Sequence, residues 1–525
     1  MVKRSWWCAF LSVLLIVMGA GSVRAVEYGE MVQKNGEWVF RSTEDPVLKL
    51  MRDKGVITNE RYNEVSAQKG KDWIEPADAV LNLRRDIEWS RYVKESTRYV
   101  KTALHLPDWI DLGLENRTRF ESVDHPWRSN QRIGGGGTDA QLALRSRARV
   151  GLGGNGPFRF LFEGQDSRAL SNDEPGDFKT TQTVNQFDIL QLFWALSINN
   201  VGGSGLRTDL HFGRMTMDFG MRRYIARNDF RNTTNAFDGV HWQIGRDNTW
   251  RFRAFLVEPV FRDDSQLDTQ TAKSIFWGAY VESAHVPWFS VNAYYFGLND
   301  QESQNKTLQR TYNTYGLRLF KLPALNEFDY EFEGAVQTGH FGTVKHFAYN
   351  PNVEAGYSFN LPWTPRFLVQ YTYSSGSRTP GGSQDGNFDV LFGARNFDLN
   401  PTGIFGAFPR VNISTPGWRL ILQPTDTLVL TVKQRFWYLA ESTAAFSGNG
   451  LQDPTGKSGN YLGHDVQLRA QWAPLWAMRQ NMDFDFGYVH WFKGSYFDSP
   501  AILAQMPTGG NKDTDYFYAG VRVRM

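Results

Sequence analysis

Apolar and polar side chains alternate along most of the chain, from about Trp109 to the end. Clusters of Gly, Asn, Asp and Pro, which are typical of turns, separate the alternating segments. Successive side chains of a strand point to opposite faces, so each segment predicts a strand with one apolar and one polar face. In the clearest segment, residues 141–152, the apolar face is rich in leucine and the polar face carries Arg145, Arg147 and Arg149.

The same pattern recurs often enough to build a closed sheet. Charged side chains stand at alternate positions of other segments: Arg159 and Glu163, Arg251 and Arg253, Asp329, Glu331 and Glu333, Arg469, Asp483 and Asp485, and Arg522 and Arg524. The pattern predicts 18 strands, centred near residues 115, 146, 162, 192, 211, 240, 254, 278, 293, 315, 333, 354, 369, 418, 432, 467, 486 and 520. An even number of strands suits a closed barrel in which every backbone group is paired.

Alternation alone does not distinguish a soluble β-sandwich from a membrane barrel. Aromatic residues make up 15% of the chain and gather at the ends of the predicted strands, as they do in the girdles of membrane barrels. The last segment, Tyr516–Met525, is itself amphipathic. We therefore predict an all-β fold, a closed antiparallel transmembrane barrel over residues 108–525, with a short helical N-terminal extension.

The amino terminus predicts export to the outer membrane of a Gram-negative type cell. An apolar run follows Lys3 and Arg4, and small residues precede a cleavage site after Ala25, so residues 1–25 are a predicted signal peptide. The run is shorter than the roughly 20 residues of a membrane-spanning helix. Removing Lys3, Arg4 and Arg24 from the 57 basic residues leaves 54, against 55 acidic residues. This near-balance offers no basic face for a nucleic acid.

Chemistry other than transport finds little support in the sequence. Cys8, the only cysteine, lies in the signal peptide, so the exported chain has no thiol for a disulfide, a zinc site or covalent haem. The histidines are scattered, and none stands in a motif with a serine. Two acidic loops, residues 171–177 and 263–268, lack the spacing of a calcium site and are interpreted as solvated turns. We expect no catalytic residues, no cofactor and no bound metal.

Two regions stand apart from the alternating pattern. Residues 26–107 are rich in Glu, Lys and Arg, and their spacing predicts a short helix pair at 46–54 and 58–68. We interpret this periplasmic, mostly helical extension as a tether or as a segment that binds a periplasmic partner. Residues 377–409 are glycine-rich without alternation and predict a long external loop; such loops sometimes fold into the lumen.

Several motifs of the chain resemble the alginate export family of outer-membrane proteins. The most distinctive includes Gly213-Arg214, Phe219-Gly220, Arg223 and the Asn-Ala-Phe-Asp-Gly-Val sequence of residues 235–240. Further similar stretches follow in order: residues 163–170, 354–357, 386–392 and 462–466. The resemblance covers roughly residues 110–525. It implies a barrel of the predicted size that often, but not always, exports an acidic polysaccharide.

The candidate pore-lining residues are arginines and carboxylates in similar numbers: Arg145, Arg147, Arg149, Arg159, Arg214, Arg223, Arg251, Arg253, Arg469, Arg522, Arg524, Glu163, Asp329, Glu331, Glu333, Asp483 and Asp485. Alternate residues of a strand are about 6.6–6.8 Å apart, so the ladder of Arg145, Arg147 and Arg149 can pass a carboxylate or phosphate from one guanidinium to the next. Alternatively, acids of the lumen neutralise each arginine, which then only braces the wall. Likewise, Arg214 and Arg223 either bind a polyanion or pair with nearby acids.

The leading hypothesis is a lipid-embedded outer-membrane channel that passively passes anionic or sugar solutes, including acidic polysaccharides. A second hypothesis is a barrel sheath that holds a partner protein, such as an electron-transfer cytochrome. A third is an unselective porin. Conductance of the isolated barrel distinguishes the second from the other two, and anion preference in a salt gradient distinguishes the first from the third.

Overall fold

The computed structural model describes residues 30–34, 37–41 and 106–524, the last range with gaps at 126–137, 155, 172–180, 247–249, 271–272, 287–288, 302–308, 379–381, 396–397, 400–406, 426, 447–449, 474–481 and 507–508. The predicted signal peptide and the predicted helices at 46–54 and 58–68 lie outside these residues. No helix within the described part of the chain is long and apolar enough to cross a membrane.

The chain divides into a small unit, residues 1–75, and a large unit, residues 76–525. In the small unit, β1 (Glu30–Lys34) and β2 (Glu37–Arg41) form an antiparallel hairpin. The sequence pattern does not predict this hairpin, because each strand is only 5 residues long and too short to establish an alternation.

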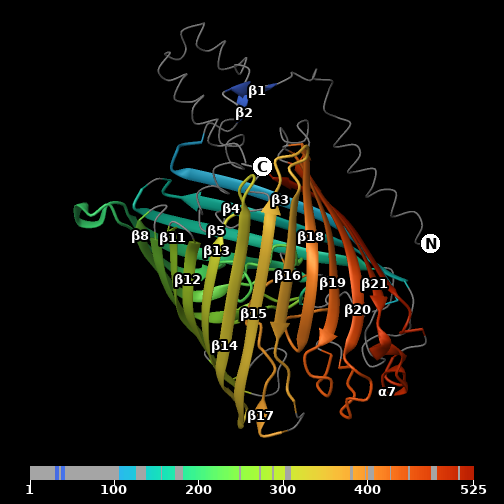
Figure 1. The fold of residues 1–525 in the computed structure, drawn as a ribbon. Coiled ribbons are helices and arrows are strands. Elements are labelled where there is room, and N and C mark those ends of the chain that lie inside the picture. Colours follow the sequence, from blue (N-terminus) through green and yellow to red (C-terminus); the bar gives the residue numbers. More distant parts are fainter. Residues whose placement is uncertain are drawn as a thin grey trace, which may run out of the picture. The chain divides into compact units, whose positions relative to one another are not determined.

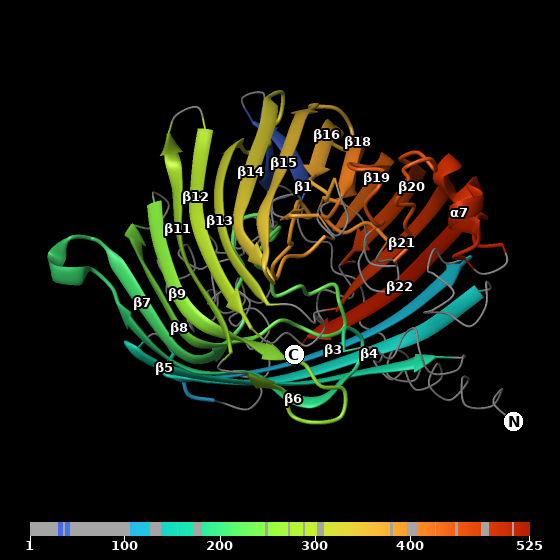
Figure 2. The ribbon, with the colours of Figure 1, turned by 90° about the horizontal axis from the view of Figure 1, so that it is seen from below.

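The large unit is a closed antiparallel barrel of 18 strands (Figures 1 and 2). These strands are β3 (Ile110–Asp124), β4 (Thr138–Leu152), β5 (Phe158–Ser171), β6 (Asn185–Ile198), β7 (Arg207–Met215), β8 (Phe237–Arg246), β9 (Trp250–Phe261), β11 (Ser274–Val286), β12 (Phe289–Asp300), β13 (Arg310–Lys321), β14 (Phe328–Phe341), β15 (Val344–Ser358), β16 (Arg366–Ser374), β18 (Ile413–Thr425), β19 (Leu428–Leu439), β20 (Tyr461–Trp472), β21 (Met482–Lys493) and β22 (Thr514–Arg524). Strand β22 pairs with β3 and closes the ring.

The structure confirms the predicted fold class, and each of the 18 predicted strand centres falls within one of these strands. The alternation also has the predicted sense. Phe158 and Phe328 are 71% and 72% exposed on the outer wall, whereas Glu163 and Asp329 of the same strands are each 3% exposed. Large apolar residues on the outside and charged residues on the inside are what a membrane barrel requires.

The two ends of the barrel differ in the length of their loops. One end has short connections such as 322–327 and 359–365, and the other carries longer connections, whose described parts fall within 375–412 and 440–460. In Figure 1 the long loops, with β17 (Gln384–Asp385) and α7 (Pro500–Leu503), lie at the end opposite the C-terminus. Bacterial barrels place short turns in the periplasm and longer loops outside, so the long loops mark the external end.

Two of the long loops enter the lumen (Figure 2). We call residues 216–236, between β7 and β8, inner loop 1, and the described residues of the range 386–412, between β17 and β18, inner loop 2. A parallel bridge joins Ile225 of inner loop 1 to Phe392 of inner loop 2. At its far end, inner loop 2 is anchored by the Phe408 ring, whose centroid lies 3.8 Å from that of Trp437 on β19.

Backbone hydrogen bonds hold the two inner loops together as a short ribbon. The amide of Phe392 donates to the Tyr224 carbonyl at 2.9 Å, and the amide of Ala394 donates to the Arg222 carbonyl at 2.8 Å. A third bond runs from the Ala226 amide to the Phe392 carbonyl at 3.1 Å. The ribbon therefore joins segments that lie far apart in the sequence.

Candidate functional site: the lumen and its inner loops

The arginine ladder faces the lumen, and an aspartate of inner loop 1 neutralises it. Oδ1 of Asp229 accepts hydrogen bonds from Arg145 at 2.9 Å and from Arg147 at 2.8 Å. Its Oδ2 accepts one from Arg522 at 3.0 Å. Glu115 of β3 also accepts a hydrogen bond from Arg145 at 2.8 Å. Arg145 and Arg147 thus share their charge with a carboxylate that does not belong to the wall.

The backbone of inner loop 1 is held by further arginines of the same wall. Arg117 donates to the Asp229 carbonyl at 2.6 Å and to the Arg231 carbonyl at 3.0 Å. Arg119 donates to the Phe230 carbonyl at 2.5 Å, and its guanidinium lies 4.3 Å from the centre of the Phe230 ring. Sequence reasoning did not identify Arg117 and Arg119. Their spacing of two residues in a predicted strand was a usable signal for a second ladder.

Arg223 anchors inner loop 1 to the opposite wall. This side chain is 1% exposed and forms ion pairs with Glu331 and Glu333 of β14 and, at 2.8 Å, with Asp398 of inner loop 2. Burial alone would lower the pKa of Arg223, but Glu331, Asp398 and Glu333 raise it well above its usual value. Arg223 therefore binds acids of this chain rather than a solute.

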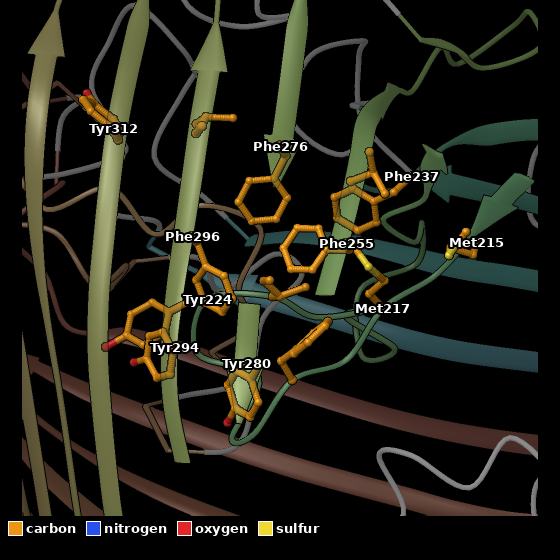
Figure 3. Close-up of a cluster of buried hydrophobic side chains, with 14 of the residues drawn as sticks. Met215, Met217, Tyr224, Phe237, Phe255, Phe276, Tyr280, Tyr294, Phe296 and Tyr312 are labelled. Atoms are coloured by element: carbon orange, nitrogen blue, oxygen red, sulfur yellow. The ribbon is translucent and has the colours of Figure 1, made fainter. Parts of the chain in front are cut away.

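An aromatic cluster packs inner loop 1 against the inner faces of β8, β9, β11 and β12 (Figure 3). The Phe219 ring packs against Tyr280 of β11 with centroids 5.2 Å apart, and the Arg253 guanidinium lies 3.8 Å above it. The Tyr224 hydroxyl donates to Asn350 of β15 at 2.9 Å. On this side the inner loops are packed like a protein core rather than suspended in water.

The remaining predicted wall residues also face the lumen, and most are paired with an opposite charge. The ion pairs are Arg159 with Asp209, Arg227 with Glu163, Arg251 with Glu282, Arg318 with Glu331, Arg366 with Asp329, Arg469 with Asp485, and Arg522 and Arg524 with Asp483. Arg149 is partly exposed on the lumenal face of β4.

Arg214 departs from the prediction, because it lies on the outer wall and not in the lumen. It shares its face of β7 with Leu210 and Phe212, which are 40% and 64% exposed. Its guanidinium pairs with Asp238 of β8, at 2.8 Å from Nε. The sequence motif around Arg214 is short, and its phase relative to the wall was not defined by a long alternating run.

Several of the lumenal charges remain in contact with water. The side chain of Asp229 is 38% exposed, and those of Arg522 and Asp483 are 23% and 25% exposed. These groups lie at or beside the ladder, so a solute that enters the lumen on this side meets Asp229 and its arginines.

Comparisons with known proteins agree with this architecture. A model of the alginate export family matches residues 108–503. The fold is similar to that of Pseudomonas aeruginosa OccK3 (OpdO), with 12% identity and a TM-score of 0.51, covering 81% of this chain and 98% of that chain. It is similar to P. aeruginosa OpdQ, with 13% identity and a TM-score of 0.51, covering 79% and 98%. For Acinetobacter baumannii OccAB1 the identity is 12% and the TM-score 0.50, covering 79% and 96%. No curated protein matches the sequence.

Proposed function

Because the chain belongs to the alginate export family, we propose that its pore passes anionic or polyhydroxylated solutes, with acidic oligosaccharides and polysaccharides as the leading class. Family and fold together make the chain an outer-membrane β-barrel channel.

The position of Asp229 carries this proposal. Its carboxylate accepts hydrogen bonds from Arg145, Arg147 and Arg522, in the way that an acidic solute would. A solute carboxylate that takes this place replaces one anion by another, so the arginines never lose their counter-charge. The Asp229 side chain is then displaced, while Arg117 and Arg119 keep the backbone of inner loop 1 on this wall, and the arginines pass the solute along the ladder.

This exchange explains why a ladder of arginines does not trap its solute. Hydrogen bonds between charged groups contribute about 1.5–3 kcal/mol each, and leaving a buried charge unpaired costs more than that. Asp229 offsets that cost when the pore is empty. Binding of each solute group is therefore weakened by competition with Asp229, and release is correspondingly faster.

Single-channel recording in a planar bilayer tests the proposal. In a salt gradient, wild-type protein should prefer anions, and added uronate oligosaccharides should block the current. Replacing Arg145, Arg147 and Arg149 by Ala should weaken both effects. The control Arg168→Ala should keep them, since Arg168 lies on the outer face of β5, where it pairs with Asp166. An open pore with no anion preference and no block would refute the selectivity and leave an unselective porin.

Asp229→Asn provides a second test of the same site. The amide cannot balance three guanidinium groups, so we expect longer open times and a higher affinity for uronates, because the competing carboxylate is gone. Unchanged gating and block would contradict the exchange. Absence of any current from wild type and from Asp229→Asn would instead favour a barrel that holds a partner protein.

A further inference from the structure

A row of polar side chains crosses the lipid-facing surface of β3, β4 and β5, which lie side by side (Figure 2). Asn116 of β3 lies directly opposite Ser146 of β4, and Ser146 lies directly opposite Asp166 of β5. Arg168 follows Asp166 on the same face of β5, and its side chain is 54% exposed. Asn116 and Ser146 are exposed, and the arginines next to them in sequence face the lumen. We call Asn116, Ser146, Asp166 and Arg168 the outer polar row.

The row lies within the apolar band of the membrane. Trp109 and Phe158, at the periplasmic ends of β3 and β5, are 54% and 71% exposed, as in the aromatic girdle that marks the interface of a membrane barrel. Asn116 is the seventh residue of β3 from that end, and Ser146 is the seventh of β4. At a rise of about 3.3 Å per residue and a tilt of about 45°, both lie about 14 Å above the girdle. The apolar band of such barrels is about 25 Å tall, so these two side chains lie near its middle.

Hydrogen-bonding groups of the row remain without a partner in the described part of the chain. The Asn116 amide donates to the Ser146 hydroxyl oxygen at 3.0 Å, but the Asn116 amide oxygen and the Ser146 hydroxyl hydrogen are unused. Nε of Arg168 donates to Oδ2 of Asp166 at 2.9 Å, and its two terminal nitrogens donate no hydrogen bond. Acyl chains cannot supply these bonds, and a polar side chain within the apolar band is costly unless it finds a partner. The row is therefore suited to contact another protein surface.

The row is complementary to itself, which favours a second copy of this chain as the partner. A carboxylate and a guanidinium that lie side by side meet the opposite charges when the same surface is turned about a twofold axis. The amide of Asn116 and the hydroxyl of Ser146 each donate and accept hydrogen bonds, so each can bind its own copy. Beside the row, Ala148 and Gly164 lie directly opposite each other on β4 and β5. Such small residues let a second wall approach closely.

From this arrangement we infer that the outer polar row is the centre of an interface between two copies of this chain in the membrane. The copies are related by a twofold axis along the membrane normal, because each barrel must keep its long loops outside. Asn116 and Ser146 of one copy exchange hydrogen bonds with the same residues of the other copy, and Arg168 reaches Asp166 of the other copy. The inference goes beyond the proposed function, since it concerns the outer face of the wall and not the lumen.

Native mass spectrometry of the full-length barrel, extracted from outer membranes in a mild detergent, tests this inference. Wild type should be a dimer of this chain. Asn116→Leu removes the hydrogen-bonding amide from both symmetric contacts and should raise the dissociation constant about tenfold, or about 1.4 kcal/mol. Asn313→Leu is the matched control, because Asn313 of β13 lies outside the row and accepts a hydrogen bond from Tyr295 of its own wall at 2.7 Å. This control should dimerise like wild type.

Cysteine crosslinking in intact outer membranes tests the same contact without detergent. Cys8 is the only native cysteine and lies in the predicted signal peptide, so each variant would carry a single thiol in the exported chain. A short bismaleimide should link Ser146→Cys into a dimer. Val353→Cys places its thiol at a similar depth on β15, where Val353 is 43% exposed, and it should remain monomeric.

Three outcomes would overturn the inference: a wild type that is monomeric, equal linking of the two cysteine variants, or a Ser146→Cys product whose mass is that of a different protein. All four variants should keep the conductance and the unboiled gel mobility of wild type, since none changes the lumen, and these readouts verify that each barrel is folded. Failure of the uronate experiments would leave the inference standing, because the row and the lumen lie on opposite faces of the wall.

Discussion

Gly393→Ala should open the pore, because Gly393 of inner loop 2 lies against the backbone of inner loop 1. A Cβ atom at this position would be 1.8 Å from the Arg223 carbonyl oxygen and 2.4 Å from its carbonyl carbon. Both atoms are backbone, so no side-chain rotation relieves the collision. The two segments of the ribbon must move apart, although the barrel wall is untouched.

The magnitude follows from the bonds that the ribbon would lose. Three backbone hydrogen bonds join residues 222–226 to residues 392–394. At about 0.5–1.5 kcal/mol each, their loss amounts to about 3 kcal/mol. Since 1.4 kcal/mol is a factor of ten in an equilibrium constant, the ratio of open to closed states should rise about 100-fold.

Single-channel recording measures this ratio directly, and a second glycine supplies the control. A Cβ atom on Gly164 of β5 would lie 3.6 Å from the ring of Phe162, an ordinary contact, so Gly164→Ala should gate like wild type. Unboiled gel mobility would verify that both barrels are folded. If folded Gly393→Ala showed the closed times of wild type, the ribbon would not occlude the pore and the reasoning would be wrong.

Three further predictions concern separate contacts. Phe219→Ala removes a packed ring, a change that costs about 3–5 kcal/mol in a core, so proteases should cut inner loop 1 faster while the barrel stays folded; equal resistance would refute this packing role. Burial and a hydrogen bond with Asp188 raise the pKa of Asp268 to about 7, so the folded state binds the proton more tightly than the unfolded state. The denaturant midpoint should therefore decrease as the pH is raised from about 4 to about 7 and stay constant above that. Asp268→Asn should remove this decrease, and a midpoint that rises with pH would contradict the prediction. Burial alone would raise the pKa of Asp229, but the surrounding guanidinium groups hold it well below its usual value. Its ion pairs are therefore complete above the usual carboxyl pKa and are lost only at a pH below that value. Conductance should stay constant between about pH 5 and pH 8, and an opening of the pore within this pH range would contradict the ion pairs.

The wall of this protein could be predicted from the sequence, because alternation is a local property. Residues 141–152 show their two faces without any knowledge of their neighbours, and the lumenal position of Arg145 and Arg147 follows from it. The same argument predicts that Asp329 and Glu333 share one face of β14, and both side chains are 3% exposed there.

What escaped prediction depends on segments that meet only in the folded barrel. Asp229 lies in a loop without alternation, and its partners come from β4 and from the last strand, β22. The glycine-rich stretch of residues 377–409 was predicted as a long loop, and its described part within inner loop 2 lies against the inner wall, where Asp398 binds Arg223. Arg214 was assigned to the pore because its motif is too short to show which side chains point into the lumen and which point outward.

The hydrogen bonds of Asp229 connect strands from the beginning and the end of the barrel. Arg145 belongs to the second strand of the ring and Arg522 to the last, and these lie on either side of the seam between β22 and β3 where the sheet closes. The carboxylate of Asp229, which lies in the middle of the chain, thus binds arginines on both sides of that seam. Closure of the cylinder and insertion of inner loop 1 are therefore thermodynamically coupled. A barrel that lacks the hydrogen bonds of Asp229 should close later, and its strands should separate first along the β3–β22 boundary.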